Sequence, residues 1–519
     1  MIDVLLLDAC DSWPRQIALL TLFALMSCAI IYRTPQRQPD PLNHLPRYEV
    51  AVAGTLEHQF PTAEALLRYA YTKHSDSPFV VGGSWRRWDT VILPPKTFDS
   101  IKSLSEDSLS FYDALDTRFL HHLTTIKVPE EGGDTPILKA LAIDLPRHLK
   151  NHVADIAEES EYAFAAILPK CDDDWVEVYP MQVLPRILAL VSGRIFMGHP
   201  LSRNPDFLNL KLGFFRNSFI AMTVLSMVPA SLRSLVARIL PPVKGLKTAH
   251  LEMQRIMKPI IEQRKIDQSQ GKEAKSDLLG WVINNTPEHL KYNVRYQSHA
   301  QLITGVASVQ SLYVATAHLW FDIAAHPGHV GPLRDEWKTL IREDPAGQVS
   351  FETMLKAWKL DSFVKESARC NPSQLTATEY VSRREIVLKD GTVLPKGTYM
   401  GTASSQLGND ARLWSSPEVF DGFRYAKLRS QPGNEGKFHF TATGLDQLSF
   451  GYGRHPCPGR YYASHVIKTM LAILIDTYEI KLPDGASRPK NLENWIAFKP
   501  NDKVPILLRK RREPHGSEE

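Results

Sequence analysis

The segment 450–460, FGYGRHPCPGR, is the feature that most constrains this chain. It encloses a single cysteine, Cys457, between glycines and prolines, and a helical pattern begins directly afterwards. Glycine permits positive φ and a close approach of the backbone to a flat ligand, whereas proline holds one loop shape. Loop N–H groups and the start of a helix stabilise a thiolate. The surroundings of Cys457 therefore indicate a thiolate that is held towards a ligand. The tripeptide Cys-Pro-Gly alone would favour a buried structural cysteine.

The same segment resembles the haem-binding signature of cytochromes P450, F-x-x-G-x-[R/H]-x-C-x-G. The matching positions are Phe450, Gly453, His455, Cys457 and Gly459. The resemblance implies haem b as cofactor, with the Cys457 thiolate as axial ligand of the iron. The thiolate donates electron density to the iron, which favours cleavage of the O–O bond. His455 stands where the family usually has arginine, as in some filamentous-fungal members. This substitution weakens one expected contact with a haem propionate.

Two further motifs resemble that family in order and spacing. Glu366 and Arg369 lie on one face of a helical pattern, about 90 residues before Cys457, where the family has its E-x-x-R. Taken alone, such a pair is more often a surface ion pair worth at most about 1 kcal/mol. Arg424, in the sequence Phe-Arg-Tyr, resembles the arginine that completes a structural triad with these two residues. The resemblance implies that the triad holds the thiolate loop in place.

The apolar pattern over 300–326 predicts a helix buried on nearly all sides. Aligned by its end, it resembles the long helix over the oxygen face of the haem. Gln310 then replaces the usual acid and Ser311 the usual threonine. A hydroxyl can position a water that delivers protons, whereas Gln310 cannot ionise and can only hold water. We therefore hypothesise that protons arrive through a water chain or a substrate hydroxyl.

Two alternatives remain open for this helix. Gln310 and Ser311 are core-packing residues in the first. In the second, the alignment shifts by one turn, and Thr304-Gly305 or Thr316 takes their place.

Helical patterns dominate the rest of the chain, and strand-like patches are few and mostly late. The helical patterns cover 62–71, 136–167, 182–197, 207–227, 230–240, 249–269, 300–326, 330–343, 360–370 and 461–478. Strand patches at 385–388 and 392–394 flank Lys389-Asp390-Gly391, a tight-turn sequence. The predicted fold is mainly α with a minor β-sheet, and the resemblance specifies the cytochrome P450 fold.

An uncharged apolar run at 17–32 predicts one N-terminal transmembrane helix. The run is slightly shorter than the roughly 20 residues that span a bilayer, so Trp13 and Tyr32 would serve as interfacial anchors. A cleaved signal peptide is the alternative, but the preceding residues are acidic and no A-x-A site follows. Arginines directly after the run place the remainder in the cytosol. We expect a single-pass protein of the endoplasmic reticulum membrane.

The domain boundaries follow from this arrangement. Residues 1–33 are the luminal tail and anchor, 34–47 a proline-rich hinge, and 48–519 the catalytic domain. A net charge of only +4, with scattered charges, argues against nucleic acid as a partner. Five cysteines without a CxxC pair argue against a disulfide framework or a zinc site.

The resemblance implies a monooxygenase that inserts one atom of O2 into a lipophilic small molecule. No flavin or nicotinamide domain is evident in the sequence, so electrons are expected from NADPH–cytochrome P450 reductase. Segments 193–199 and 440–447 resemble filamentous-fungal members of secondary metabolism, which suggests a terpenoid substrate. One alternative is a haem-thiolate isomerase or dehydratase that acts without a reductase, which the missing acid at Gln310 motivates. The other is a non-catalytic haem-binding protein.

Overall fold

The computed structural model describes residues 41–50, 59–82, 89–126, 135–494 and 497–512. They form two compact units. The first contains the described residues before 127 together with Gly213–Glu252 and Thr378–Ala403. The second contains residues 135–212, Met253–Ala377 and the described residues from Ser404 onward.

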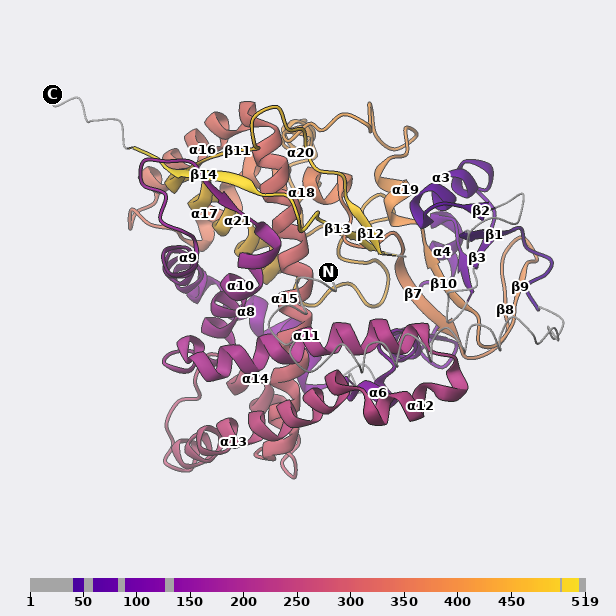
Figure 1. Cartoon of the computed structure of the whole chain (residues 1–519), viewed down its shortest axis with the longest axis horizontal. Helices are drawn as coiled ribbons and strands as arrows, with labels where there is room; N and C mark the ends of the chain where they lie inside the picture. The colour runs from indigo at the N-terminus through magenta and orange to yellow at the C-terminus, as the bar shows by residue number, and fades with distance from the viewer. Residues whose placement is uncertain (1–40, 51–58, 83–88, 127–134, 495–496, 513–519) are drawn as a thin grey trace. The chain divides into compact units, whose positions relative to one another are not determined.

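The second unit is built around α15 (Val294–Ala325), the long helix in Figure 1. Its N-cap, Asn293, accepts the Tyr296 N–H at 3.0 Å, and the helix ends before the His326-Pro327 pair. Trp320 and Phe321 are almost completely buried. The helices that pack against α15 include α10 (Pro180–Met197), α18 (Trp358–Cys370), α21 (Arg460–Thr477) and α14 (Leu278–Asn285).

A buried acid joins α15 to α18. Asp322 is fully buried and accepts hydrogen bonds from Ser367 Oγ at 2.6 Å and from Asn371 Nδ2 at 3.0 Å. Arg488 pairs with the same carboxylate. A buried carboxylate is tolerated only when it is paired and hydrogen-bonded, so this cluster fixes the two helices in register.

Further helices of this unit range from five to 15 residues in length. They are α9 (Val153–Ile167), α16 (Val330–Glu343), α17 (Phe351–Lys356), α19 (Ser404–Gly408) and α20 (Arg424–Arg429). Two sheets accompany them, one of order β11-β14-β6 (Tyr478–Lys481, Ile506–Lys510, Val176–Val178) and a pair of β12 (Leu492–Asn494) and β13 (Ala497–Lys499).

The prediction of one continuous helix over 136–167 was wrong. The segment is divided into α7 (Pro136–Lys139), a π-helical turn Ala140–Asp144, α8 (Leu145–His148), a 3-10 turn and α9. Pro146 has no N–H to donate to the preceding turn, which is a physical reason for the break. The other helices exist as predicted, although α15 begins at Val294, earlier than expected.

The first unit contains a seven-stranded sheet of order β2-β1-β3-β4-β10-β7-β5. Its strands are β1 (Arg47–Val50), β2 (Gln59–Phe60), β3 (Phe79–Gly82), β4 (Thr90–Ile92), β5 (Leu109–Ser110), β7 (Ala377–Ser382) and β10 (Tyr399–Thr402). Five of them lie before residue 111, so strands are more numerous than expected. Eight of the fourteen strands in the described residues nevertheless follow residue 376, as the expectation of mostly late strands requires. The strands are two to six residues long, too short for an alternating pattern.

The predicted late hairpin is confirmed. β8 (Ile386–Val387) pairs antiparallel with β9 (Val393–Leu394), and Gly391 in the turn has a φ of +85°. The helices of this unit are α3 (Ala63–Lys73), α4 (Pro95–Ile101), α5 (Phe111–Phe119), α6 (His121–Thr124) and α12 (Ala230–Ile239). Two long helices, α11 (Pro205–Met227) and α13 (Pro241–Ser269), contribute residues to both units.

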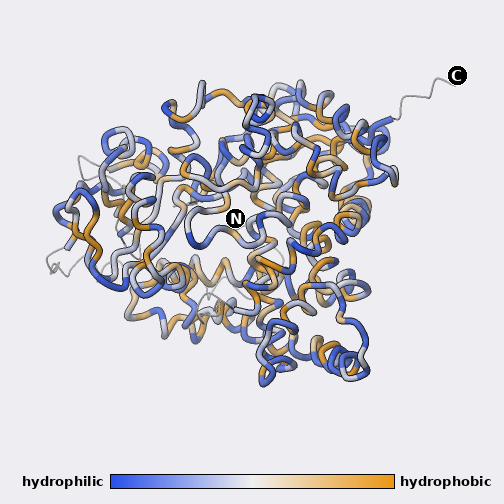
Figure 2. The backbone as a smooth tube through the Cα atoms, turned by 180° about the vertical axis from the view of Figure 1, so that it is seen from behind, coloured by the Kyte–Doolittle hydropathy of each residue, from blue (hydrophilic) through white to orange (hydrophobic). Residues whose placement is uncertain are grey.

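The mainly α fold with minor β structure is confirmed. Figure 2 shows hydrophobic and hydrophilic residues alternating along most helices, as amphipathic packing requires. Among the described residues one helix, α15, is long and apolar enough to cross a membrane, and 72% of its most apolar stretch is buried within the protein. The predicted anchor, 1–33, lies outside the described residues, as does the predicted hinge except 41–47.

Candidate functional site

The loop around Cys457 has the backbone that its glycines predict. Gly451 and Gly453 have φ values of +72° and +94°, a region that side chains with a Cβ rarely adopt. The Cys457 N–H donates to the Phe450 carbonyl at 2.7 Å, which closes the loop. The thiol itself is half-buried.

Hydrogen bonding and charge act on the thiol from the start of α21. Burial raises the pKa of the Cys457 thiol, whereas the Gly459 N–H, which donates to the sulfur, and the positive charge of Arg460 lower it. Arg460 also donates to the Cys457 carbonyl at 3.1 Å. The site therefore supplies the donors that stabilise a thiolate in a partly desolvated position.

His455 lies half-buried in the same loop. Its Nε2 lies 3.2 Å from Nη2 of Arg454. A guanidinium has only donors, so the imidazole nitrogen is the acceptor in this contact. An imidazole lacks the planar fork of donors that the arginine usual at this position in the family offers to a carboxylate.

The middle of α15 exposes a narrow face on a helix that is otherwise buried. Ala307 and Ser311 are exposed, and Ser308 and Ala315 are half-buried. The spacing of 307, 311 and 315 places these three residues on one side of the helix. Ser311 Oγ donates to the Ala307 carbonyl at 3.1 Å, which leaves its lone pairs available on the exposed side.

The other predicted positions on α15 differ from Ser311. Gln310 is half-buried, and its Oε1 is buried without a hydrogen-bond partner among the described residues. Thr304 is buried, and its hydroxyl donates to the Ala300 carbonyl at 2.7 Å. Thr316 is also buried. Ser311 is therefore the hydroxyl on the exposed face, while Thr304 and Thr316 belong to the packed faces.

The structure brings together the three predicted triad residues. Glu366 is fully buried on α18 and accepts two hydrogen bonds from Arg369, at 2.7 and 2.9 Å. Arg424 Nε lies 3.1 and 3.2 Å from the two Glu366 oxygens. Burial lowers the pKa of Arg369, but the hydrogen bonds to Glu366 outweigh burial and raise it above its ordinary value.

The remaining guanidinium donors of the triad hold a long irregular segment. Arg369 donates to the carbonyls of Gly408 and Pro417, at 2.5 and 2.8 Å. Arg424 donates to the Ser415 carbonyl at 2.6 Å. Arginine suits this position because its planar fork bonds a carboxylate and backbone carbonyls together. The triad therefore fixes residues 408–417 against α18.

Sequence reasoning missed a second set of contacts, which runs from α18 to the cysteine loop. Asp361 accepts the Phe440 N–H at 2.8 Å and pairs with Lys468 of α21 at 3.2 Å. The Phe440 ring lies 4.9 Å from the Phe450 ring, and the Phe450 carbonyl accepts the Cys457 N–H. Asp361 stands five residues before Glu366 in no recognisable motif, so the sequence contained no signal for it.

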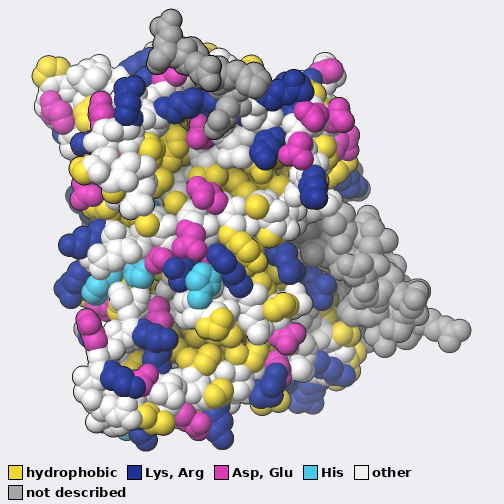
Figure 3. Space-filling model, turned by 90° about the vertical axis from the view of Figure 1, so that its left-hand side faces the viewer, with side chains coloured by type: hydrophobic (Ala, Val, Ile, Leu, Met, Phe, Trp, Pro, Cys, Tyr) yellow, Lys and Arg dark blue, Asp and Glu magenta, His cyan; other side chains and the backbone are white. Residues whose placement is uncertain are grey.

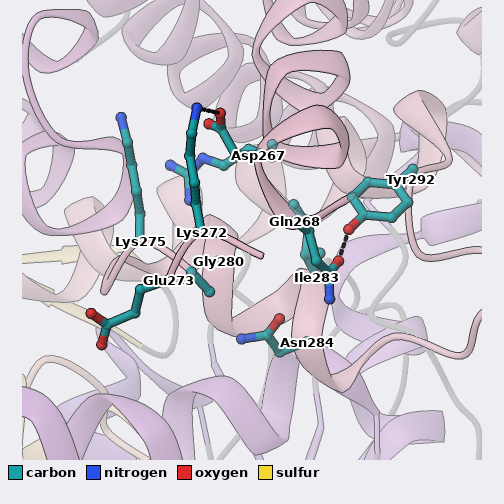
Figure 4. Close-up of a pocket in the computed structure, with 11 residues that line it drawn as sticks. Asp267, Gln268, Lys272, Glu273, Lys275, Gly280, Ile283, Asn284 and Tyr292 are labelled. Atoms are coloured by element: carbon teal, nitrogen blue, oxygen red, sulfur yellow. Dashed lines mark hydrogen bonds and ion pairs between the residues drawn. The ribbon is translucent and has the colours of Figure 1, made fainter. Parts of the chain in front are cut away.

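A surface pocket between α13 and α14 is shown in Figure 4. Its charged residues are already paired, Arg264 with Asp277 and Lys272 with Asp267, and Tyr292 donates to Gln268. Figure 3 shows Lys and Arg interspersed with Asp and Glu over one face of the molecule, so that face has no field of a single sign. Neither feature points to a particular ligand.

The chain belongs to the cytochrome P450 family, because the family profile described as Cytochrome P450 matches residues 143–507. It is an oxidoreductase of the monooxygenase type found in the secondary metabolism of filamentous fungi. The chain is 36% identical to the cytochrome P450 monooxygenase prx8 of Penicillium rubens, over 82% of this chain and 78% of that protein. It is 34% identical to the cytochrome P450 monooxygenase ORF5 of Penicillium roqueforti, over 95% of this chain and 90% of that protein.

A solved structure has the same fold. "Retinoic acid bound cyanobacterial CYP120A1" superposes with a TM-score of 0.61 over 84% of this chain and 92% of that chain, at 18% identity. The fold is therefore that of the cytochrome P450 family, as the resemblance of the cysteine loop predicted.

The cofactor of this family is haem b with a cysteine thiolate on the iron, and the site fits it. Cys457 is half-buried on a loop of positive-φ glycines, just before the start of α21 and beside the positive charge of Arg460. A Cβ at Gly459 would meet no other atom within 4 Å, so space is available beside the loop. When bound, the cofactor supplies the iron at which O2 is activated.

Proposed function

We propose that this protein oxidises a lipophilic small molecule of terpenoid type, using O2 and electrons from NADPH–cytochrome P450 reductase. The observation that carries the proposal is the Cys457 thiol, half-buried on its glycine loop, which is closed by the hydrogen bond from the Cys457 N–H to the Phe450 carbonyl. In this proposal Cys457 would hold the haem iron through its thiolate, and Phe450, Gly453 and Gly459 of the same loop would pack against the cofactor. His455 would contact one of its propionates. The terpenoid class is supported by the motifs at 193–199 and 440–447.

Turnover with purified fungal reductase tests this proposal. The protein, incubated with NADPH, O2 and a panel of terpenoid skeletons, is expected to give products heavier by one oxygen atom. No product is expected when the reductase is omitted. Turnover that proceeds equally without NADPH and reductase would instead support a haem-thiolate isomerase and contradict the proposal.

In the proposed reaction, Ser311 holds the water that delivers protons from the exposed face of α15. Its hydroxyl is anchored on the Ala307 carbonyl and can accept a hydrogen bond from that water. Gln310 can hold a second water but cannot donate a proton by ionising, so the proton has to originate elsewhere. Proton delivery is expected to depend on Ser311.

Ser311→Ala is therefore expected to lower the amount of product formed per NADPH consumed by several-fold, while NADPH consumption continues. The matched control is Ser308→Ala, which removes a hydroxyl that donates to the Gly305 carbonyl on the same helix. Both ratios are measured from product and NADPH in the same reaction. An unchanged ratio in Ser311→Ala would remove Ser311 from proton delivery.

We also propose that the protein is attached to the endoplasmic reticulum membrane, with its catalytic part in the cytosol. The apolar run at 17–32 and the arginines after it support this proposal. Exposed apolar side chains on the first unit also support it, namely Met227, Leu235, Ile239 and Leu251, which are 54–69% exposed. Deleting residues 1–33 is expected to move most of the protein from the microsomal pellet to the supernatant. A deletion variant that stays fully in the pellet would contradict an anchor in this segment.

A further inference from the structure

Lys211 lies in an environment that is unusual for a lysine. It belongs to α11, and only 7% of it is exposed. Its ammonium nitrogen lies 5.4 Å from the ring centroid of Phe207 and 5.6 Å from that of Phe196, both of which are 1% exposed. Lysine is almost never buried to this degree without an anionic partner.

No carboxylate of the described chain pairs with Lys211, and no described residue accepts a hydrogen bond from it. Burial alone lowers its pKa to about 8, without a contribution from any charged neighbour. The aromatic faces attract a cation but provide no hydrogen-bond acceptor comparable to a carboxylate. Lys211 is therefore a buried cation, and none of the described residues supplies an anion to pair with it.

Other buried lysines in the same unit show the usual arrangement. Lys468 pairs with Asp361 at 3.2 Å and donates to the Met354 carbonyl at 2.9 Å. Lys365 donates to the His439 carbonyl at 3.1 Å. Lys211 differs from both because it has neither kind of partner, which makes a structural role the weaker explanation.

The backbone of α15 leaves room for this lysine. A Cβ at Gly305 would lie 3.1 Å from Lys211 Cε, which is closer than ordinary contacts. Glycine inside a helix lowers helix stability relative to alanine, so its presence here needs a reason, and the lysine stem supplies one. The space that Gly305 leaves is occupied by the side chain that carries the unpaired charge.

Gly305 lies one helical turn before Ser308, at the border of the exposed face of α15. The Gly305 carbonyl accepts a hydrogen bond from Ser308 Oγ at 3.2 Å, and Ser308 borders the face that presents Ala307 and Ser311. Ser311 stands six positions after Gly305, which corresponds to about 9 Å along the helix axis. An acidic group at the lysine and a reacting carbon beside Ser311 thus fit within one medium-sized molecule.

We infer that Lys211 binds a carboxylate of the substrate and so selects lipophilic acids over their neutral analogues. The inference rests on the proposed function, because it assigns the acid to the molecule that is oxidised. The carboxylate completes the pairing that the chain leaves open, while the rings of Phe196 and Phe207 provide apolar surface beside it. Lys211 thus determines specificity for the acid group, whereas the rest of the substrate is apolar.

Calorimetric titration of the haem-loaded protein with matched acids and esters tests the inference. The probes are dodecanoic, hexadecanoic and abietic acids, each compared with its methyl ester at pH 7. At least one acid is expected to bind about 10- to 100-fold more tightly than its ester, as a charge-assisted hydrogen bond provides. If every acid binds no more tightly than its ester, the inference is overturned.

Two variants and one control identify the residue responsible. Lys211→Met is expected to abolish the preference for the acid while leaving ester affinity within about twofold. Gly305→Ala keeps the charge but displaces the lysine stem, and is expected to weaken acid binding by a smaller factor. Lys338→Met, which removes an exposed lysine of α16, is expected to change neither affinity. Retention of the acid preference in Lys211→Met would assign recognition to another residue and overturn the inference.

Thermal unfolding provides a readout that does not depend on a ligand. Because Lys211 lacks a protein partner, Lys211→Met is expected to unfold at the same temperature as the wild type or a higher one. A lower unfolding temperature in this variant would show that the lysine is held by the protein itself, against the inference. The carbon monoxide difference spectrum of the same samples reports the haem-thiolate centre separately. The spectrum thus shows whether the haem-thiolate centre has formed, independently of whether the titration detects a preference for acids over esters.

Discussion

Glu366→Ala is expected to destabilise the protein by about 3–5 kcal/mol, because it leaves two buried guanidinium groups without their carboxylate. Glu366 is 0% exposed and accepts hydrogen bonds from Arg369, from Arg424 and from the Asp421 N–H. The same two arginines hold the carbonyls of residues 408–417, so their displacement also releases that segment. A loss of this size is a large part of the stability of an ordinary protein.

The measurement is the urea concentration at half-unfolding, together with the yield of soluble haem-loaded protein. Glu366→Gln retains the shape but not the charge and is expected to fall between the alanine variant and the wild type. The control is Glu385→Ala, an exposed glutamate of the first unit, which is expected to unfold like the wild type. Identical unfolding of Glu366→Ala and the wild type would show that the triad contributes no stability.

Cys457→Ala is expected to reduce product formation with NADPH and reductase to below detection. A methyl group has no lone pair to give to the iron, so neither haem-thiolate ligation nor the reactivity that depends on it can form. The loop itself is closed by the hydrogen bond between the Cys457 N–H and the Phe450 carbonyl, which alanine can still make. The helix content by circular dichroism is therefore expected to match the wild type.

Cys171→Ala is the matched control, since Cys171 is buried and no ligand role is assigned to it. That variant is expected to retain most of the activity. Product formation by Cys457→Ala at even a tenth of the wild-type rate would contradict the assignment of the axial ligand to Cys457.

The features that could be predicted from the sequence are those encoded locally or by family spacing. Gly451 and Gly453 adopt the positive φ that glycine permits, and the turn at Gly391 forms between two short strands. Glu366 and Arg369 stand three residues apart on one helix, so their contact follows from helix geometry. Arg424 could be placed with them only through the family resemblance, because its contact spans 58 residues.

The missed features depend on contacts between distant segments. The early strands β3 and β4 gain their definition from pairing with β1 and β10, and their own sequences are too short to reveal it. The pairing of Asp361 with Lys468 joins residues 107 apart, and neither belongs to a motif. Burial of Lys211 was also invisible, since lysine at that position fits an exposed helix face equally well.

The register of α15 is an intermediate case. The sequence allowed Ser311, Thr304 or Thr316 as the hydroxyl of the site, because all three lie on one apolar helix. The structure differentiates them by exposure, since Ser311 is exposed and both threonines are buried. That distinction depends on which side of the helix is packed by its neighbours, which a nearly uniform apolar sequence does not encode.

The most direct test of the haem-thiolate assignment is the carbon monoxide difference spectrum of the reduced protein, measured for the wild type and for Cys457→Ala. We expect the wild type to show the red-shifted Soret band that gives the family its name, and the variant to lack it. A folded, haem-loaded wild type without that band, or a variant that keeps it, would contradict ligation of the iron by Cys457.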